Sequence, residues 1–258
     1  MQLEHVPLLQ IQRDLYNIPR GWERFQEYIR TMTGGTSDMV LPLVAMNPMG
    51  KEHVGALLDA LLALDAEGVA GEAAAEAQRR LASVPGQFKL GLVVCDDAQG
   101  GWTNRYFTET NIRFNLLNML KRGWIAPLYW TSEAPSRDQV RAAVLADVYR
   151  AAYTLIHGEP ETLAQMMAQE GLAAAFAGER QLGLDPEELE YSRGVIRPHR
   201  DTTDFPTAFA CLYGDEIAVS VGYPALGLSP RAGYAVALAD ALAGGVSPDQ
   251  ALLATARA

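Results

Sequence analysis

Two short apolar segments in the middle of the chain constrain its fold most strongly. Residues 88–95 place alternate apolar side chains on one face and become apolar on both faces toward the end. Residues 124–130 form a second apolar run. The roughly 28 residues between the two segments contain a glycine-rich turn and a predicted helix. A connection of this length with a helix in it is typical of a crossover between parallel strands. We therefore predict that the two segments are neighbouring parallel strands of a sheet covered on both faces.

Strand and helix patterns alternate around these two segments. The apolar run 39–46 has the length and boundaries of a buried strand, although Pro42 favours an edge position or a bulge. Residues 217–222 are a candidate for a fourth strand. Helical periodicity or capping residues predict helices over 8–15, 22–32, 51–64, 67–82, 103–121, 136–157 and 160–169, with further helices beginning near 185, 229 and 247.

This alternation predicts an α/β fold, with a small parallel or mixed sheet flanked by helices and a helical C-terminal extension. The alternative is a mainly helical protein with a small hairpin. The length favours a single domain over 1–258, in which 39–157 form the α/β core and 158–258 the extension.

The acidic composition excludes some classes of function. The chain has 21 Lys and Arg against 31 Asp and Glu, a net charge of −10, and no basic run. Nucleic acids and anionic membranes need clustered positive charge, so we expect neither as a partner. No apolar run reaches about 18 residues, and the start of the chain lacks a secretion signal. Since Cys95 and Cys211 form no disulfide pattern, we predict a soluble protein of the cytoplasm.

Three polar segments, 47–53, 96–106 and 131–133, follow the predicted strands. Ligands of open α/β sheets bind outside the carboxyl ends of the strands, which share one edge. We therefore expect the three segments to converge on a ligand site.

The segment 96–106 is the richest in groups that bind ligands. Asp96 and Asp97 are candidate ligands of Mg²⁺, because hard cations prefer oxygen. Arg105 is a candidate clamp for a carboxylate or phosphate. The remaining candidates for contact with a substrate are Trp102, Asn104 and Tyr106. The alternative is structural: a turn with aromatic side chains in the core.

His53 lies in the first turn of a predicted buried helix, beside the first polar segment. A neutral imidazole in this place is a candidate general base, and a structural histidine is the alternative. Lys51 is unfavourably placed for the dipole of that helix, which indicates a function or, as the alternative, a solvated surface lysine. The residues around Gly50 and Lys51 do not complete a nucleotide-binding loop, because positions 45 and 52 are Ala and Glu.

The segment 197–204 is a second polar cluster. His199 is a candidate acid or base that Asp201 or Asp204 could orient, and Arg200 is a candidate anion ligand. We predict that this segment closes over the strand-end segments, because its charges cannot be buried without partners. The alternative is a loop held by its own salt bridges.

These residues support two hypotheses. The first is a cytoplasmic enzyme that acts on a small polar or anionic substrate, by hydrolysis or transfer that Mg²⁺ could assist. In this hypothesis His53, His199 and Asp201 are catalytic. The alternative is a non-catalytic protein that binds a small molecule, or one that binds a protein through its acidic stretch 157–192. A homo-oligomer is compatible with both.

Overall fold

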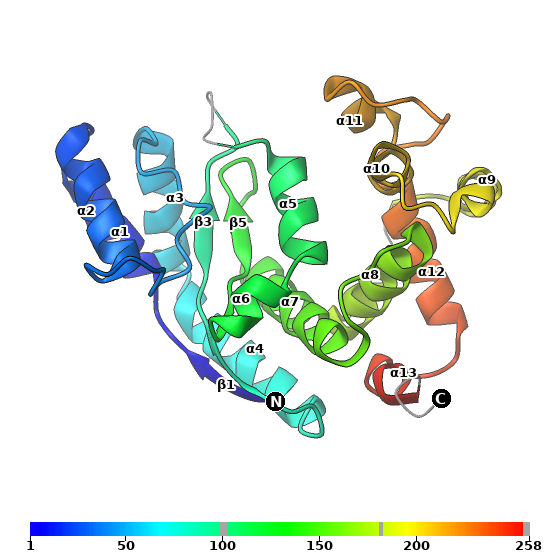
Figure 1. Ribbon diagram of the computed structural model, residues 1–258, viewed down its shortest axis with the longest axis horizontal. Helices are drawn as coiled ribbons and strands as arrows, with labels where there is room; N and C mark the ends of the chain where they lie inside the picture. Colours follow the sequence, from blue (N-terminus) through cyan, green and yellow to red (C-terminus); the bar gives the residue numbers. More distant parts are fainter. Residues whose placement is uncertain (99–102, 181–182, 255–258) are drawn as a thin grey trace. The chain divides into compact units, whose positions relative to one another are not determined.

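The structure, a computed structural model, describes residues 1–98, 103–180 and 183–254 (Figure 1). The chain forms two compact units, Met1–Val148 and Tyr149–Ala258, divided within helix α7 (Arg137–His157). The predicted α/β fold class is confirmed, with small parallel sheets flanked by helices and a helical C-terminal part. The predicted single domain, with its core at 39–157, stays a prediction.

Two small parallel sheets lie in the first unit. The first contains β1 (Gln2–His5), β2 (Gln87–Leu90) and β4 (Trp124–Ile125), in that order, and the second pairs β3 (Val93–Cys95) with β5 (Leu128–Trp130). Lys89 lies opposite Trp124 and Val93 opposite Leu128, both in parallel register. The predicted parallel pairing of 88–95 with 124–130 is therefore confirmed, and the hairpin alternative does not fit these pairs.

Each of the two predicted strands is interrupted once, at 91–92 and at 126–127, so that it contributes to both sheets. The buried side chain of Gln12 bridges the first interruption. Its Nε2 donates to the carbonyl of Leu92 (2.8 Å), and its Oε1 accepts from the backbone N–H of Val94 (2.8 Å). A side-chain amide thus supplies hydrogen bonds to buried backbone groups, which cannot remain unpaired without cost.

Gln12→Leu is expected to lower the free energy of unfolding by about 2–3 kcal/mol, because it leaves two buried backbone groups without partners. Gln10→Leu is the matched control, since Gln10 is exposed and donates to Asp14 (2.8 Å) on the same helix. Urea titration followed by tryptophan fluorescence measures both changes. Equal effects of the two substitutions would show that the bridge does not stabilise the sheets.

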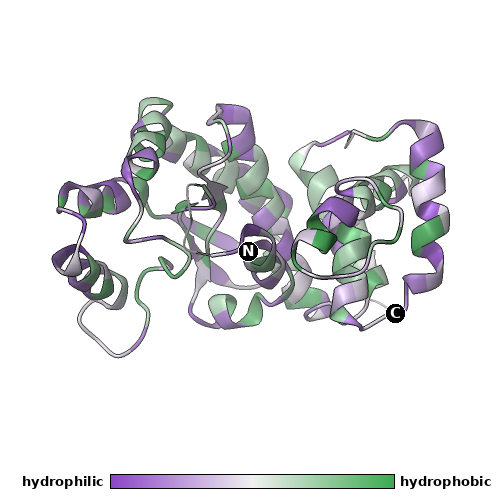
Figure 2. Cartoon of the chain, turned by 90° about the horizontal axis from the view of Figure 1, so that it is seen from above, coloured by the Kyte–Doolittle hydropathy of each residue, from purple (hydrophilic) through white to green (hydrophobic). Residues whose placement is uncertain are grey.

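Helices surround the strands of the first unit. They are α1 (Leu9–Asn17), α2 (Trp22–Thr33), α3 (Glu52–Ala63), α4 (Ala66–Arg80), α5 (Arg105–Phe114), α6 (Leu117–Lys121) and the first part of α7. Figure 1 shows α1 and α3 on one side of β3 and β5, and α5 on the other. The helical ribbons in Figure 2 carry both hydrophobic and hydrophilic residues, as expected for helices with one buried face. The predicted continuous helix 103–121 is wrong, because it divides into α5 and α6.

The predicted strand at 39–46 is also wrong, because this segment is irregular. Its side chains nevertheless enter the core, where Leu43 and Met46 are fully buried. The backbone N–H groups of Val40 and Leu41 both donate to the carbonyl of Met32, at the end of α2. The apolar run therefore reflects burial, which periodicity alone cannot distinguish from a strand.

The second unit is helical within the described residues. It contains the end of α7, α8 (Leu163–Ala177), α9 (Pro186–Ile196), the 3-10 helix η1 (Arg197–His199), α10 (Phe205–Tyr213), α11 (Asp215–Ser220), α12 (Ala232–Ala243) and α13 (Pro248–Ala254). The predicted helix start at Asp185 is confirmed, since its side chain accepts from the N–H of Glu188 (2.9 Å). The predicted start at Pro160 is wrong, because Thr162 caps α8 together with Gln165.

The candidate fourth strand at 217–222 is contradicted, because most of this segment belongs to α11. The side chain of Asp215, at the start of α11, accepts hydrogen bonds from the backbone N–H groups of Leu226, Gly227 and Leu228. These bonds hold the following turn against the helix. Tertiary hydrogen bonds thus override the strand propensity of Ile217 and Val219.

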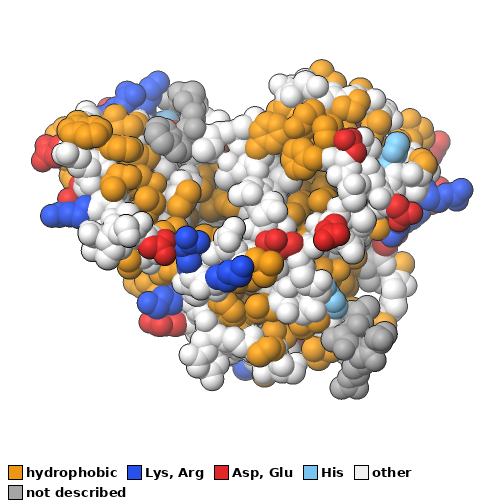
Figure 3. All heavy atoms as spheres, viewed as in Figure 1, with side chains coloured by type: hydrophobic (Ala, Val, Ile, Leu, Met, Phe, Trp, Pro, Cys, Tyr) orange, Lys and Arg blue, Asp and Glu red, His pale blue; other side chains and the backbone are white. Residues whose placement is uncertain are grey.

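The described helices include none that is both long enough and apolar enough to cross a membrane. On the face shown in Figure 3, Lys and Arg side chains are scattered among Asp and Glu. Several Lys and Arg side chains of the protein form ion pairs, such as Arg141 with Glu76 (2.7 Å) and Arg193 with Asp240 (2.8 Å). A cluster of cations without such partners is therefore a candidate site for an anionic ligand.

Candidate functional site

The three polar segments of the first unit do meet, and the carboxylate of Asp96 lies where they join. Asp96 directly follows β3 and is 3% exposed. Its Oδ2 accepts from Asn47 Nδ2 (2.7 Å), and its Oδ1 accepts from Thr131 Oγ1 (3.0 Å). The backbone N–H of Ala98 also donates to Oδ1 (3.2 Å). Asp96 therefore fixes the positions of all three segments.

His53 supplies a further donor to Asp96. It is the second residue of α3, its side chain is 17% exposed, and its Nε2 lies 2.7 Å from Asp96 Oδ1. Because an ionised carboxylate only accepts hydrogen bonds, Nε2 carries the proton. In the neutral imidazole Nδ1 then holds a free lone pair. This Nδ1 is buried and has no hydrogen-bond partner among the described residues.

Asp97 and Arg105 form a second network beside Asp96. Asp97 accepts from Ser132 Oγ (2.7 Å), from the backbone N–H of Ser132 (3.0 Å) and from Arg105 Nη1 (3.3 Å), and it shares the Thr131 hydroxyl (3.1 Å) with Asp96. The guanidinium of Arg105 also pairs with Glu109 (2.7 Å) and with Glu133. Three carboxylates thus surround this cation, so little of its charge is left for a ligand. The anion-binding role of Arg105 stays a prediction.

The metal role of Asp96 and Asp97 also stays a prediction. Every carboxylate oxygen of the pair accepts at least one hydrogen bond. In residues 1–98, 103–180 and 183–254, no three His, Cys, Asp or Glu side chains are placed to share a metal ion. A cation at this position would have to displace donors that already satisfy both carboxylates.

The pKa of Asp97 predicts how stability depends on pH. Burial raises this pKa, but hydrogen bonds from Ser132 and Thr131 and the charge of Arg105 outweigh burial and lower it. The stabilisation is therefore complete above the unfolded-state pKa of about 4, and is lost as the pH falls through the lower folded-state value.

Asp97→Asn is expected to cost about 1–2 kcal/mol of unfolding free energy at neutral pH, because it weakens charge-assisted hydrogen bonds. Below about pH 4 the difference between the variant and the wild type should shrink, since protonation removes the same charge from the wild type. Urea titrations between neutral and acidic pH measure both. A difference that does not depend on pH would contradict this assignment.

The other candidates of the segment 96–106 have local structural contacts. Asn104 is the N-cap of α5, where its side chain accepts from the N–H of Phe107 (3.1 Å). Tyr106 is half-buried in the first turn of α5, and its carbonyl accepts from Thr110 Oγ1 (2.7 Å). Trp102 lies outside the described residues. None of these contacts tests a role in substrate binding.

The segment 197–204 belongs to the second unit, so its predicted closure over the strand-end segments stays a prediction. The carbonyls of Arg200 and Thr202 accept from the N–H groups at the start of α8, and Asp204 caps α10. Arg200 lies 3.8 Å from Asp240. The predicted catalytic residue His199 ends η1, and the predicted catalytic residue Asp201, which is exposed, lies two positions later. The segment thus connects α9 to α10, accepts hydrogen bonds from the start of α8 and caps α10.

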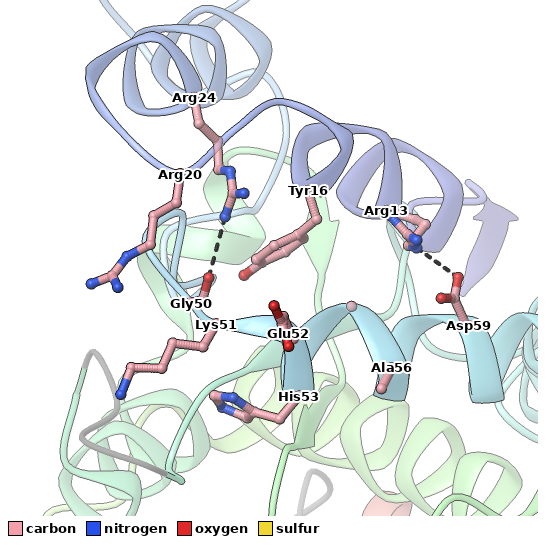
Figure 4. A pocket seen from close by; sticks show the side chains of 11 residues that line it. Arg13, Tyr16, Arg20, Arg24, Gly50, Lys51, Glu52, His53, Ala56 and Asp59 are labelled. Atoms are coloured by element: carbon pink, nitrogen blue, oxygen red, sulfur yellow. Dashed lines mark hydrogen bonds and ion pairs between the residues drawn. The ribbon is translucent and has the colours of Figure 1, made fainter.

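The neighbourhood of His53 is a pocket, which we call the cationic pocket (Figure 4). It has a volume of about 840 Å³ and lies between α1, the start of α2 and the start of α3. Its lining residues are Arg13, Tyr16, Arg20, Arg24, Gly50, Lys51, Glu52, His53, Gly55, Ala56 and Asp59. Four of them are Lys or Arg and two are acidic, in a chain whose net charge is −10. The pocket is therefore a local concentration of positive charge.

Sequence reasoning identified His53 and noted Lys51, but it missed Arg13, Arg20 and Arg24. The available signal was three arginines within 13–24, around the break between the first two helices, in an otherwise acidic chain. The pocket itself could not be predicted, because it forms where α1 and α2 pack beside a helix distant in the sequence.

Comparison with known proteins does not indicate an activity for this chain. No protein-family model and no solved structure matches the chain. The uncharacterized protein YjfC of Bacillus subtilis (strain 168) is 35% identical over 96 residues, which cover 34% of this chain and 32% of the relative. The chain thus matches about a third of the length of that relative, whose name states no ligand or reaction. The function has to be inferred from the geometry of the site.

Proposed function

We propose that the protein is a cytoplasmic enzyme that acts on a small anionic substrate, with His53 as its general base. The observation that carries this proposal is the state of the imidazole. Nε2 is anchored on buried Asp96, while Nδ1 has no partner among the described residues and belongs to a side chain that lines the cationic pocket. A general base needs a free lone pair close to the bound substrate.

Asp96 is the positioning residue in this proposal. It holds one tautomer of His53 and stabilises the imidazolium that forms when Nδ1 accepts a proton. Asn47 and Thr131 fix the carboxylate in turn, so the imidazole is held by a buried network. A water molecule or a hydroxyl group of the substrate would have to reach the buried Nδ1 from the pocket. Nδ1 then removes its proton, and the resulting nucleophile takes part in hydrolysis or transfer.

In the test, the protein is incubated with a mixture of small phosphomonoesters, carboxylates and sulfonates. Mass spectrometry monitors the loss of each compound. We expect the wild type to consume at least one compound, and His53→Gln to reduce the rate by about 10²–10⁴-fold. Asp96→Asn should also reduce it, with an altered dependence of rate on pH. Parallel assays with and without Mg²⁺ test whether the reaction is metal-assisted.

His5→Gln is the matched control. His5 Nε2 lies 2.8 Å from Glu67 Oε2, so it is also a histidine paired with a carboxylate, but it does not line the cationic pocket. This variant should keep the wild-type rate. Equal rates for wild type and His53→Gln would overturn the proposal. If no compound is consumed but one binds, the non-catalytic alternative replaces it.

A further inference from the structure

The cations of the cationic pocket differ in whether they already have a counter-charge. Arg13 pairs with Asp59 (2.6 Å), as the dashed line in Figure 4 shows. Among the described residues, no carboxylate pairs with Arg20, Arg24 or Lys51. These three side chains come from the break after α1, from α2 and from the residue before α3. Glu52 contributes one opposing negative charge to the lining.

Arg24 is the most informative of the three cations, because it is only 7% exposed. Its Nε donates to the carbonyl of Ile18 (2.7 Å), its Nη1 donates to that of Gly50 (3.2 Å), and its guanidinium lies 5.1 Å from the centre of the Tyr16 ring. These contacts orient the guanidinium without neutralising it. The pKa of Arg24 is lowered, and burial is the main cause. A buried charge without a counter-ion is unfavourable unless a ligand supplies one.

The start of α3 adds uncharged donors to the same pocket. Lys51 is the N-cap residue of this helix, and its side chain makes no capping hydrogen bond. The backbone N–H groups of Lys51, Glu52 and His53 have no hydrogen-bond partner among the described residues. Free N–H groups at the start of a helix bind anions, and the helix dipole favours negative charge there.

We propose that the cationic pocket binds a phosphoryl dianion, either inorganic phosphate or the phosphate of a small phosphomonoester. Arg20, Arg24 and Lys51 line the pocket from three elements, which suits the tetrahedral oxygens of a phosphate. A planar carboxylate carries one charge and would be satisfied by one bidentate arginine. Where the ligand is the substrate of the enzyme, this inference rests on the proposed function. The bound phosphate group then holds the substrate beside His53.

The closing experiment is calorimetric titration of the full chain with inorganic phosphate at constant ionic strength. We expect saturable binding, weakened about tenfold or more by Arg20→Gln and by Lys51→Gln, since each removes a charge-assisted contact. Both residues are exposed and unpaired among the described residues, so these variants should fold normally. Glu52→Gln should instead tighten binding, because it removes a like charge. Arg30→Gln, on the same helix as Arg24 but paired with Glu27, should bind as the wild type does.

Further titrations with glycerol phosphate and malonate identify the ligand. Tighter binding of the phosphomonoester than of phosphate indicates a larger substrate, and the reverse order indicates free phosphate. Malonate bound as tightly as phosphate would overturn the inference, as would absence of phosphate binding or equal weakening by Arg30→Gln. If phosphate does not bind but turnover still depends on His53, the proposed function stands and this inference fails. If phosphate binds but turnover does not depend on His53, the proposed function fails and the phosphate site stands.

Discussion

Asp96→Ala is expected to lower the free energy of unfolding by about 3 kcal/mol, the largest effect that we foresee in the first unit. The substitution leaves Asn47 Nδ2 and His53 Nε2 without their acceptor, while Thr131 Oγ1 keeps Asp97 Oδ1 as an acceptor (3.1 Å). Each unsatisfied buried donor costs about 1–3 kcal/mol, and partial access of water to His53 reduces the sum. The three segments that meet at Asp96 lose their common contact at the same time.

Asp38→Ala is the control for this prediction. Asp38 is likewise a hydrogen-bonded carboxylate, with Arg122 as its donor (3.2 Å), but its side chain is 70% exposed. Exposed ion pairs contribute about 0–1 kcal/mol, so this variant should stay close to the wild type. Urea titration followed by circular dichroism compares the two. An Asp96→Ala variant as stable as Asp38→Ala would mean that the buried network does not hold the segments together.

Gly171→Ala is expected to destabilise the second unit by about 3 kcal/mol. Gly171 lies on α8 where this helix meets α12. A Cβ atom at this position would lie 2.1 Å from the carbonyl oxygen of Ala237 and 2.5 Å from its carbonyl carbon. Both are backbone atoms, which cannot rotate away as the end of a side chain can. The two helices would therefore have to separate, with loss of packing along the rest of their contact.

Gly194→Ala separates this effect from the general effect of alanine in helices. Gly194 lies in α9, and a Cβ atom there would meet no atom within 4 Å. Alanine should therefore stabilise α9 by about 0.5–1 kcal/mol through helix propensity. Thermal unfolding followed by circular dichroism should show opposite shifts for the two variants. Shifts in the same direction would contradict the close approach of α8 and α12.

The candidate site could be predicted in part. The sequence identified His53, Asp96 and the three segments that meet there, because parallel strands place their carboxyl ends at one edge. It also assigned an anion-binding role to Arg105, whose charge the structure compensates with Asp97, Glu109 and Glu133. Asp97 and Glu109 are near Arg105 in the sequence, but Glu133 could not be foreseen, since it comes from a segment that the sequence does not connect to α5.

The local pattern of residues determined the parallel pairing of 88–95 with 124–130, the fold class and most helices. Side-chain periodicity and the length of a crossover are properties of neighbouring residues, so they can be read along the chain. Only the tertiary structure decided that β1 joins the sheet, that 39–46 is irregular and that Gln12 bridges the interrupted strand. It also decided which arginines keep an uncompensated charge. These features depend on hydrogen bonds and packing between residues far apart in the sequence, and the local pattern contains no measure of those distances.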